Sequence, residues 1–163
     1  MQIVQGTITY KKAHGSGYFH TISTEGETYR FFSKNDNFSL FENCEVVLSR
    51  KNNTYFLDDF LSLEETAPLR KNPRNFIAAS WLAELAHSFT MPDAPELDFI
   101  RKCRETLFSD FSSETLDAIE SDYCAVSGFP ADEKKENILS DYFSNSLNIR
   151  KSLLNQLKIR GER

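Results

Sequence analysis

Apolar and polar residues alternate over most of the first 63 positions, and a period of two is typical of strands with one buried face. In the opening segment, Val4, Ile8 and Tyr10 share one face, and polar residues occupy the other. The alternation predicts five strands, over residues 2–10, 18–23, 28–33, 44–49 and 55–63.

Turn-forming residues separate the predicted strands. Residues 14–17 and 25–26 contain glycine, and Asn52 and Asn53 tolerate left-handed backbone angles, so each site suits a reversal of the chain. Five short strands leave unpaired edges in an open sheet, and closure into a small barrel removes those edges. The pattern alone fits both an OB-type barrel and an SH3-like barrel.

The pattern changes at Asn72 and Pro73, which together form a helix start, since Asn caps free amides and proline has no amide to satisfy. From there apolar residues recur every three or four positions, as on amphipathic helices. We expect helices over residues 73–89, 93–109, 132–143 and 147–160, with a further helix that Ser112 or Ser113 caps and that Gly128 and Pro130 stop.

The predicted fold class is therefore α+β. A small five-stranded barrel occupies residues 1–70, and a helical bundle over residues 71–163 packs on it, with the boundary between residues 64 and 73.

Composition narrows the function classes. With 163 residues, 40% of them apolar and 26% charged, the chain is globular and too short for a large multidomain enzyme. Its net charge of -5 gives no general attraction to nucleic acid, so any such site must be local. No apolar run is long enough to cross a bilayer and the start is not that of a secretory signal, so we expect a cytoplasmic protein without a membrane partner.

Residues for catalysis or metal binding are sparse. The three histidines are dispersed, and Cys44, Cys103 and Cys124 are widely spaced, so we expect packing thiols, no metal and no cofactor. No nucleophile elbow, phosphate loop or dinucleotide fingerprint occurs. Glu84 and His87 are three residues apart on a predicted helix and fit a general-base pair, although hydrogen bonding at the helix surface is the commoner role. The chain is not expected to be an enzyme.

The remaining candidates concern binding. Tyr29 or Phe31 on the third predicted strand is a candidate for stacking on nucleic-acid bases. Cations near the strand ends can gather on one rim of the barrel and contact phosphates, and the same residues fit a mixed, solvated surface equally well. These cations are Lys11, Lys12, Arg30, Lys34, Arg50 and Lys51.

The order of elements and several local strings resemble the bacterial recombination mediator family RecO. The opening hairpin, residues 3–23, resembles the first hairpin of that family's OB barrel. Residues 75–85, Asn-Phe-Ile-Ala-Ala-Ser-Trp-Leu-Ala-Glu-Leu, resemble the family's first bundle helix, and residues 123–130, Tyr-Cys-Ala-Val-Ser-Gly-Phe-Pro, are similar to a later helix end. The resemblance covers most of the chain and favours the OB type of barrel.

This resemblance implies a non-catalytic factor of DNA repair and homologous recombination. Such a protein binds single-stranded and duplex DNA, works with a RecR-like protein, and helps load the recombinase or anneal strands. It also contacts the acidic, apolar-ended C-terminal tail of single-strand binding protein, which requires a hydrophobic pocket beside cations. On the second predicted helix, our candidates for that pocket are Phe99, Arg101, Lys102, Arg104 and Phe108.

The chain departs from the family in three respects. It is shorter than family members commonly are. The four-cysteine zinc element is missing, because residues 131–134 lead straight into another helix, so the resemblance is to a short, divergent member without the metal. The basic loop after the third strand is reduced to Ser-Lys-Asn-Asp-Asn at residues 33–37, which predicts weak DNA binding. The alternative is a protein-interaction adaptor with an OB-like barrel and no nucleic-acid binding.

Overall fold

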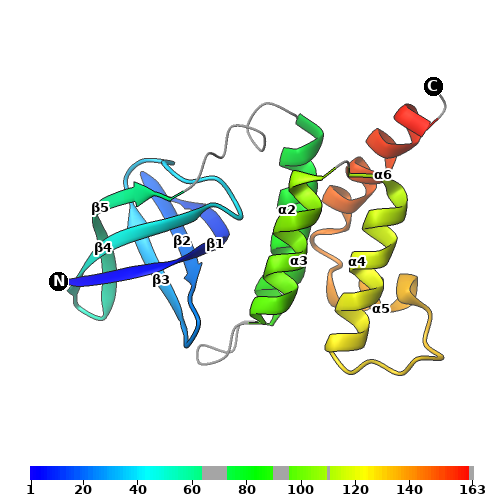
Figure 1. Ribbon diagram of the computed structural model, residues 1–163, viewed down its shortest axis with the longest axis horizontal. Helices are drawn as coiled ribbons and strands as arrows, with labels where there is room; N and C mark the ends of the chain where they lie inside the picture. The colour runs from blue at the N-terminus through cyan, green and yellow to red at the C-terminus, as the bar shows by residue number, and fades with distance from the viewer. Residues whose placement is uncertain (64–72, 90–95, 110, 162–163) are drawn as a thin grey trace.

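The computed structural model describes residues 1–63, 73–89, 96–109 and 111–161. Its N-terminal part is a closed barrel with the strand order β1-β2-β3-β5-β4 (Figure 1). The strands are β1 (Gln2–His14), β2 (Gly17–Ser23), β3 (Thr28–Ser33), β4 (Asn43–Lys51) and β5 (Thr54–Ser62). All five predicted strands are present, and the first is four residues longer than residues 2–10.

The long first strand closes the barrel. Its first half pairs with β4, from Gln2 opposite Leu48 to Thr7 opposite Asn43, and its second half pairs with β2. β3 and β5 then join in parallel, and the resulting order is that of an OB barrel and not of an SH3-like one. The strand order settles what the hydrophobic pattern left open, and the predicted α+β class is confirmed.

Inward side chains of β1 to β4, together with Phe38 from the connection between β3 and β4, build the barrel core, and the turns follow the expected chemistry. Asn52 and Asn53 both have positive φ, 50° and 65°, as a tight hairpin of type I′ requires. The apolar residues buried inside the barrel are Val4, Ile8, Ile22, Phe31, Phe38, Cys44, Val46 and Leu48.

The C-terminal part contains the described helices α2 (Pro73–Ser88), α3 (Leu97–Phe108), α4 (Ser113–Val126), α5 (Lys135–Tyr142) and α6 (Leu147–Gly161). Ser112 caps α4 as predicted, because its hydroxyl accepts the Thr115 amide at 3.2 Å while the Thr115 hydroxyl accepts the Ser112 amide at 2.7 Å. The predicted start of the second helix at Asp93 and the predicted domain boundary near residues 64–73 fall largely outside the described residues.

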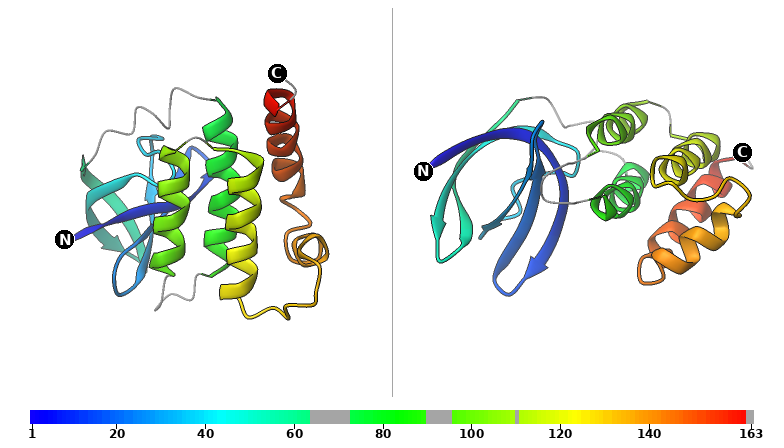
Figure 2. Two further views of the ribbon diagram at one scale, coloured as in Figure 1. Left: turned by 45° about the vertical axis from the view of Figure 1, so that its right-hand side comes forward. Right: turned by 90° about the horizontal axis from the view of Figure 1, so that it is seen from below.

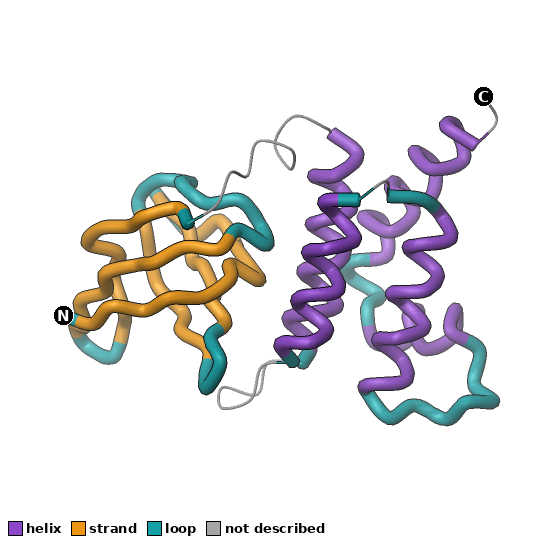
Figure 3. The backbone as a smooth tube through the Cα atoms, viewed as in Figure 1, coloured by secondary structure: helices purple, strands orange, loops and turns teal. Residues whose placement is uncertain are grey.

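Contacts on two sides join the barrel to the helices, of which α2 and α3 lie nearest to it (Figure 2). Leu40 and Phe41, from the connection between β3 and β4, are buried in the helical core. Arg104 of α3 donates from Nε to the Phe41 carbonyl at 3.0 Å. On the other side, the ring of Tyr10 on β1 stacks on His87 of α2, with centroids 3.9 Å apart. Strands and helices thus form separate regions that share part of one core (Figure 3).

A buried ion cluster ties the helices together. Glu120 on α4 is only 1% exposed, and it accepts hydrogen bonds from Trp81 Nε1 at 2.9 Å and from Arg150 Nε at 2.6 Å. Arg150 on α6 also donates to both carboxylate oxygens of Glu136 at 2.9 Å. The hydrogen bonds to Glu120 and Glu136 raise the pKa of Arg150, so this guanidinium is permanently charged.

Replacement of Glu120 by Gln is expected to lower the free energy of unfolding by about 3 kcal/mol, because it leaves the buried Arg150 charge with Glu136 alone. Urea denaturation followed by circular dichroism measures the change. The exposed Glu114 on the same helix provides the control, and Glu114→Gln should shift stability by less than about 0.5 kcal/mol. Equal effects of the two substitutions would contradict the account of this cluster.

His20 lies inside the barrel with no exposed surface. Its ring stacks on Phe31 at 5.2 Å and meets the edge of Phe38 at 5.1 Å, and neither ring nitrogen has a hydrogen-bond partner among the described residues. The nearest carboxylate oxygen belongs to Asp36, at 3.9 Å from Nε2, and Asp36 is itself paired with Lys11. Burial lowers the pKa of His20 to about 4, although Asp36 acts in the opposite direction.

This buried imidazole predicts acid lability of the barrel. His20 binds a proton near pH 6.5 in the unfolded chain, but only near pH 4 in the folded chain. The free energy of unfolding is therefore highest above pH 6.5, and it decreases as the pH is lowered from 6.5 to about 4. Urea titrations across the window should show the wild type losing about 3 kcal/mol more than His20→Leu. Parallel losses in both proteins would refute this role of His20.

Candidate nucleic-acid interface

Three phenylalanine rings form a row on the outside of the barrel. Phe19 on β2 is opposite Phe32 on β3, and Phe32 is opposite Phe56 on β5. Adjacent rings meet edge to face, with centroids 5.4 Å and 6.1 Å apart. Each ring is partly exposed, and we call Phe19, Phe32 and Phe56 the aromatic row.

The outward direction of this row follows from what is buried behind it. His20 and Phe31, the chain neighbours of Phe19 and Phe32, have no exposed surface and point into the barrel. Because successive side chains of a strand point to opposite faces, Phe19 and Phe32 must point outward. The outer surface of β2 and β3 is the part of an OB barrel that binds oligonucleotides and oligosaccharides.

Gly17 provides the space in which the Phe32 ring lies. A Cβ atom at position 17 would be 2.4 Å from Cζ of Phe32 and 2.5 Å from the Ser33 carbonyl oxygen. Neither distance is possible for a real side chain, and the Ser33 atom belongs to the backbone and cannot turn away. The ring of Phe32 therefore depends on a glycine in the strand beside it.

Cations border the aromatic row. The guanidinium carbon of Arg30 lies 4.4 Å from the centroid of Phe19, and Lys12 is opposite Phe19 in the register of β1 and β2. Lys34 is exposed directly after β3. Lys51 is exposed opposite Thr54, which shares a face of β5 with Phe56. Four of the six predicted phosphate contacts thus surround one surface.

The other two predicted cations are engaged elsewhere. The ammonium group of Lys11 is 2.9 Å from Asp36 and donates to the Phe38 carbonyl at 3.0 Å, so its charge is neutralised at the end of the barrel. Arg50 donates to the Asn53 side chain at 2.9 Å within the turn between β4 and β5. The six residues therefore do not form one continuous rim.

The two aromatic residues proposed from sequence lie on the wrong side of β3. Phe31 is fully buried against His20, so the expectation that it stacks on a base is wrong. Tyr29 is half-buried, packs against the barrel core, and accepts a hydrogen bond from Gln2 Nε2 at 2.8 Å. Arg30 identifies the outward face of β3 in the sequence, because its charged side chain favours water. Phe32 lies two positions further along the strand and therefore shares that face.

The residues proposed on α3 for a partner peptide do not assemble into one pocket. Phe99 is only 2% exposed and packs on Phe89 and Tyr123 in the helical core, so its assignment to a surface pocket is wrong. Helical spacing turns it inward with Cys103 and Leu107.

The other α3 candidates have different contacts. Arg101 pairs with Asp98 at 3.3 Å, and Lys102 pairs with Asp122 of α4 at 2.9 Å. Arg104 holds the barrel connection, and its guanidinium carbon lies 4.9 Å from the ring centroid of Phe108, which is 40% exposed. Only Phe108 is left as an apolar surface residue of the set.

A polar groove of about 410 Å³ lies where the barrel meets the helices, beside the aromatic row. We call it the junction groove. It is lined by Tyr10 and Lys12 of β1, Glu84 and His87 of α2, and the connection at residues 144–146. Burial lowers the pKa of His87, so its ring is neutral near pH 7. Glu84 and His87, which fitted either a general-base pair or a hydrogen bond at the helix surface, thus both line one groove, where the His87 ring stacks on Tyr10.

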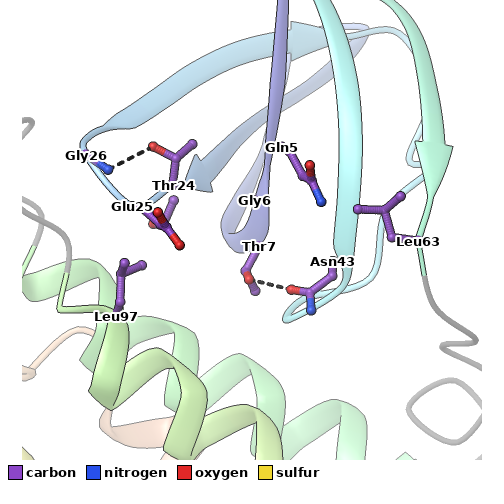
Figure 4. A pocket seen from close by; sticks show the side chains of 10 residues that line it. Gln5, Gly6, Thr7, Thr24, Glu25, Gly26, Asn43, Leu63 and Leu97 are labelled. Carbon is purple, nitrogen blue, oxygen red and sulfur yellow. Dashed lines mark hydrogen bonds between the residues drawn. The ribbon is translucent and has the colours of Figure 1, made fainter.

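A larger cavity of about 720 Å³ lies on another side of the barrel (Figure 4). The hydroxyl of Thr7 donates to Asn43 there at 2.5 Å, and Leu97 of α3 lies across from them. Glu25 is the one charged side chain among the described residues that line it. This cavity offers an anionic ligand no cation from those residues.

Metal-ligating side chains do not cluster within the described ranges. No group of three or more His, Cys, Asp or Glu residues there lies close enough together to hold a metal ion. None of the described helices combines the length and apolar character needed to cross a membrane. No protein-family model matches the chain, and no curated protein matches it either.

The contact between Gly17 and Phe32 predicts a steep cost for one added methyl group. Gly17→Ala should lower the free energy of unfolding by about 2 kcal/mol, because the strand and the ring must both move. Gly26→Ala is the matched control, since a Cβ at position 26 meets no atom within 4 Å, and it should leave stability nearly unchanged. Urea denaturation measures the free energy of unfolding of both variants. Equal stabilities would show that the Phe32 ring has room to move.

Proposed function

We propose that this protein is a non-catalytic factor of DNA repair and homologous recombination that binds single-stranded DNA on the aromatic row and its surrounding cations. The observation that carries the DNA-binding part is the row itself, three outward phenylalanine rings on β2, β3 and β5 of an OB barrel, bordered by Lys12, Arg30 and Lys34.

The chemistry of the surface suits unpaired bases. Stacking of a base on an aromatic ring contributes about 1 to 3 kcal/mol and is open to every base, since each has a π-face. The bordering cations supply phosphate contacts on both sides of the rings. In duplex DNA the bases already stack on each other, so we expect the single strand to bind more tightly. The net charge of -5 opposes either form and keeps the affinity modest.

The place of this activity in recombination rests on the resemblance to the RecO family. A barrel followed by a helical bundle is the order of domains that the resemblance implies, and it is compatible with a protein that acts in the cytoplasm with a RecR-like protein and the tail of single-strand binding protein. In this proposal the protein breaks and forms no covalent bond. It helps load the recombinase or anneal strands, and the labelled DNA should be recovered unaltered.

Binding of a labelled oligonucleotide of about 12 nucleotides tests the DNA interface. Fluorescence anisotropy should show affinity falling about 20- to 50-fold between roughly 50 and 200 mM salt, as expected for three or four phosphate contacts on a single strand. Phe32→Leu should weaken binding about tenfold through lost stacking. Arg30→Gln should reduce the salt dependence by about one phosphate contact.

Two exposed residues on the helices provide the controls. Phe108→Leu and Arg101→Gln, both on α3, make the same chemical changes on a helix that contributes no residue to the aromatic row or to the junction groove, and both should leave binding unchanged. Absence of binding at low salt would exclude the DNA interface. Capture of a RecR-like protein or of the peptide tail in that case would favour the adaptor function instead.

A further inference from the structure

The junction groove continues the surface of the aromatic row. Lys12, on its rim, is opposite Phe19, the first ring of the row. Tyr10, on its wall, is opposite Thr21, which is in turn opposite Arg30. Neighbouring strands lie about 4.8 Å apart, so a nucleic-acid strand that stacks on Phe19 reaches the groove within one nucleotide.

Charge decides which part of a nucleotide this groove accepts. Glu84 and Arg30 both lie close enough to Tyr10 and His87 to act on the pKa of each, while burial keeps His87 neutral near pH 7. Arg30 also lies over the ring of Phe19, on the aromatic row. The Glu84 carboxylate repels a phosphate, whereas Lys12 and Arg30, on the side of the row, attract one. The arrangement therefore places the backbone at Lys12 and Arg30 and a base beside Glu84 in the groove.

Hydrogen bonding decides which base it is. A carboxylate is an acceptor only, and it pairs with an exocyclic amino group, which adenine carries at N6, cytosine at N4 and guanine at N2. Thymine has no amino group, and its single N3–H lies between two carbonyl oxygens that a carboxylate repels. Asn145, which is exposed and also lines the groove, has an amide that donates and accepts and so serves any amino base.

We infer that the junction groove is a binding site for one unpaired base that carries an exocyclic amino group, with Glu84 as the residue that selects it. This inference rests on the proposed binding of single-stranded DNA to the aromatic row. With this site, the helical bundle also contributes to DNA binding. The site would prefer some bases over others, a preference that the aromatic row does not have.

The test uses the full chain and a set of oligonucleotides of about 12 thymidines in which one dC or dA is moved stepwise along the strand. In the wild type, dC or dA at one position is expected to raise the affinity about fivefold over thymidine. Glu84→Gln should remove this preference, because an amide both donates and accepts. Glu114→Gln, on the far helix α4, should retain it.

The possible outcomes separate the two proposals. A position-dependent preference in the wild type and in Glu114→Gln, lost in Glu84→Gln, supports the base site. Equal binding of all oligonucleotides by the wild type overturns the base site and leaves the proposed function intact. A base preference that persists in Glu84→Gln has the same consequence. Failure of every oligonucleotide to bind removes the proposed function itself, and the base site with it.

Discussion

Burial of His20 and Phe31 inside a closed barrel is the constraint on which the candidate interface depends. Once these two rings point inward, the pleat of β2 and β3 leaves Phe19, Arg30 and Phe32 no direction but outward. Closure of the barrel through the parallel pairing of β3 with β5 then brings Phe56 beside Phe32. The aromatic row is therefore a consequence of how the core is filled.

The helices contribute by position. The Phe41 carbonyl bound by Arg104 and the stack of Tyr10 on His87 hold α2 and α3 against one side of the barrel and leave the surface of β2 and β3 open. The buried cluster around Glu120 then joins α4 and α6 to α2. A groove forms where the two parts meet, and it borders the aromatic row because Lys12 of β1 lines the groove and lies opposite Phe19.

Elements that local chemistry specifies were predictable from sequence, and the site was only partly so. The paired asparagines at positions 52 and 53, the cap at Ser112 and the period-two strands all occur as expected, since each depends on neighbouring residues. The choice between OB and SH3 order depends on the long-range pairing of β1 with β4 and of β3 with β5, which no local pattern encodes. The inward side of β3 was also misjudged, because aromatic residues occupy both of its faces and only Arg30 distinguishes them.

The central claim is that the outer surface of β2, β3 and β5 is where a single strand of DNA binds. Titration of a thymidine oligonucleotide into isotope-labelled protein, followed by amide chemical shifts, tests it residue by residue. The largest changes are expected at Phe19, Arg30, Phe32 and Phe56 and in the turn before Gly17, with little change in α3 and α4. Shifts confined to the helices, or none at saturating oligonucleotide, would contradict the account.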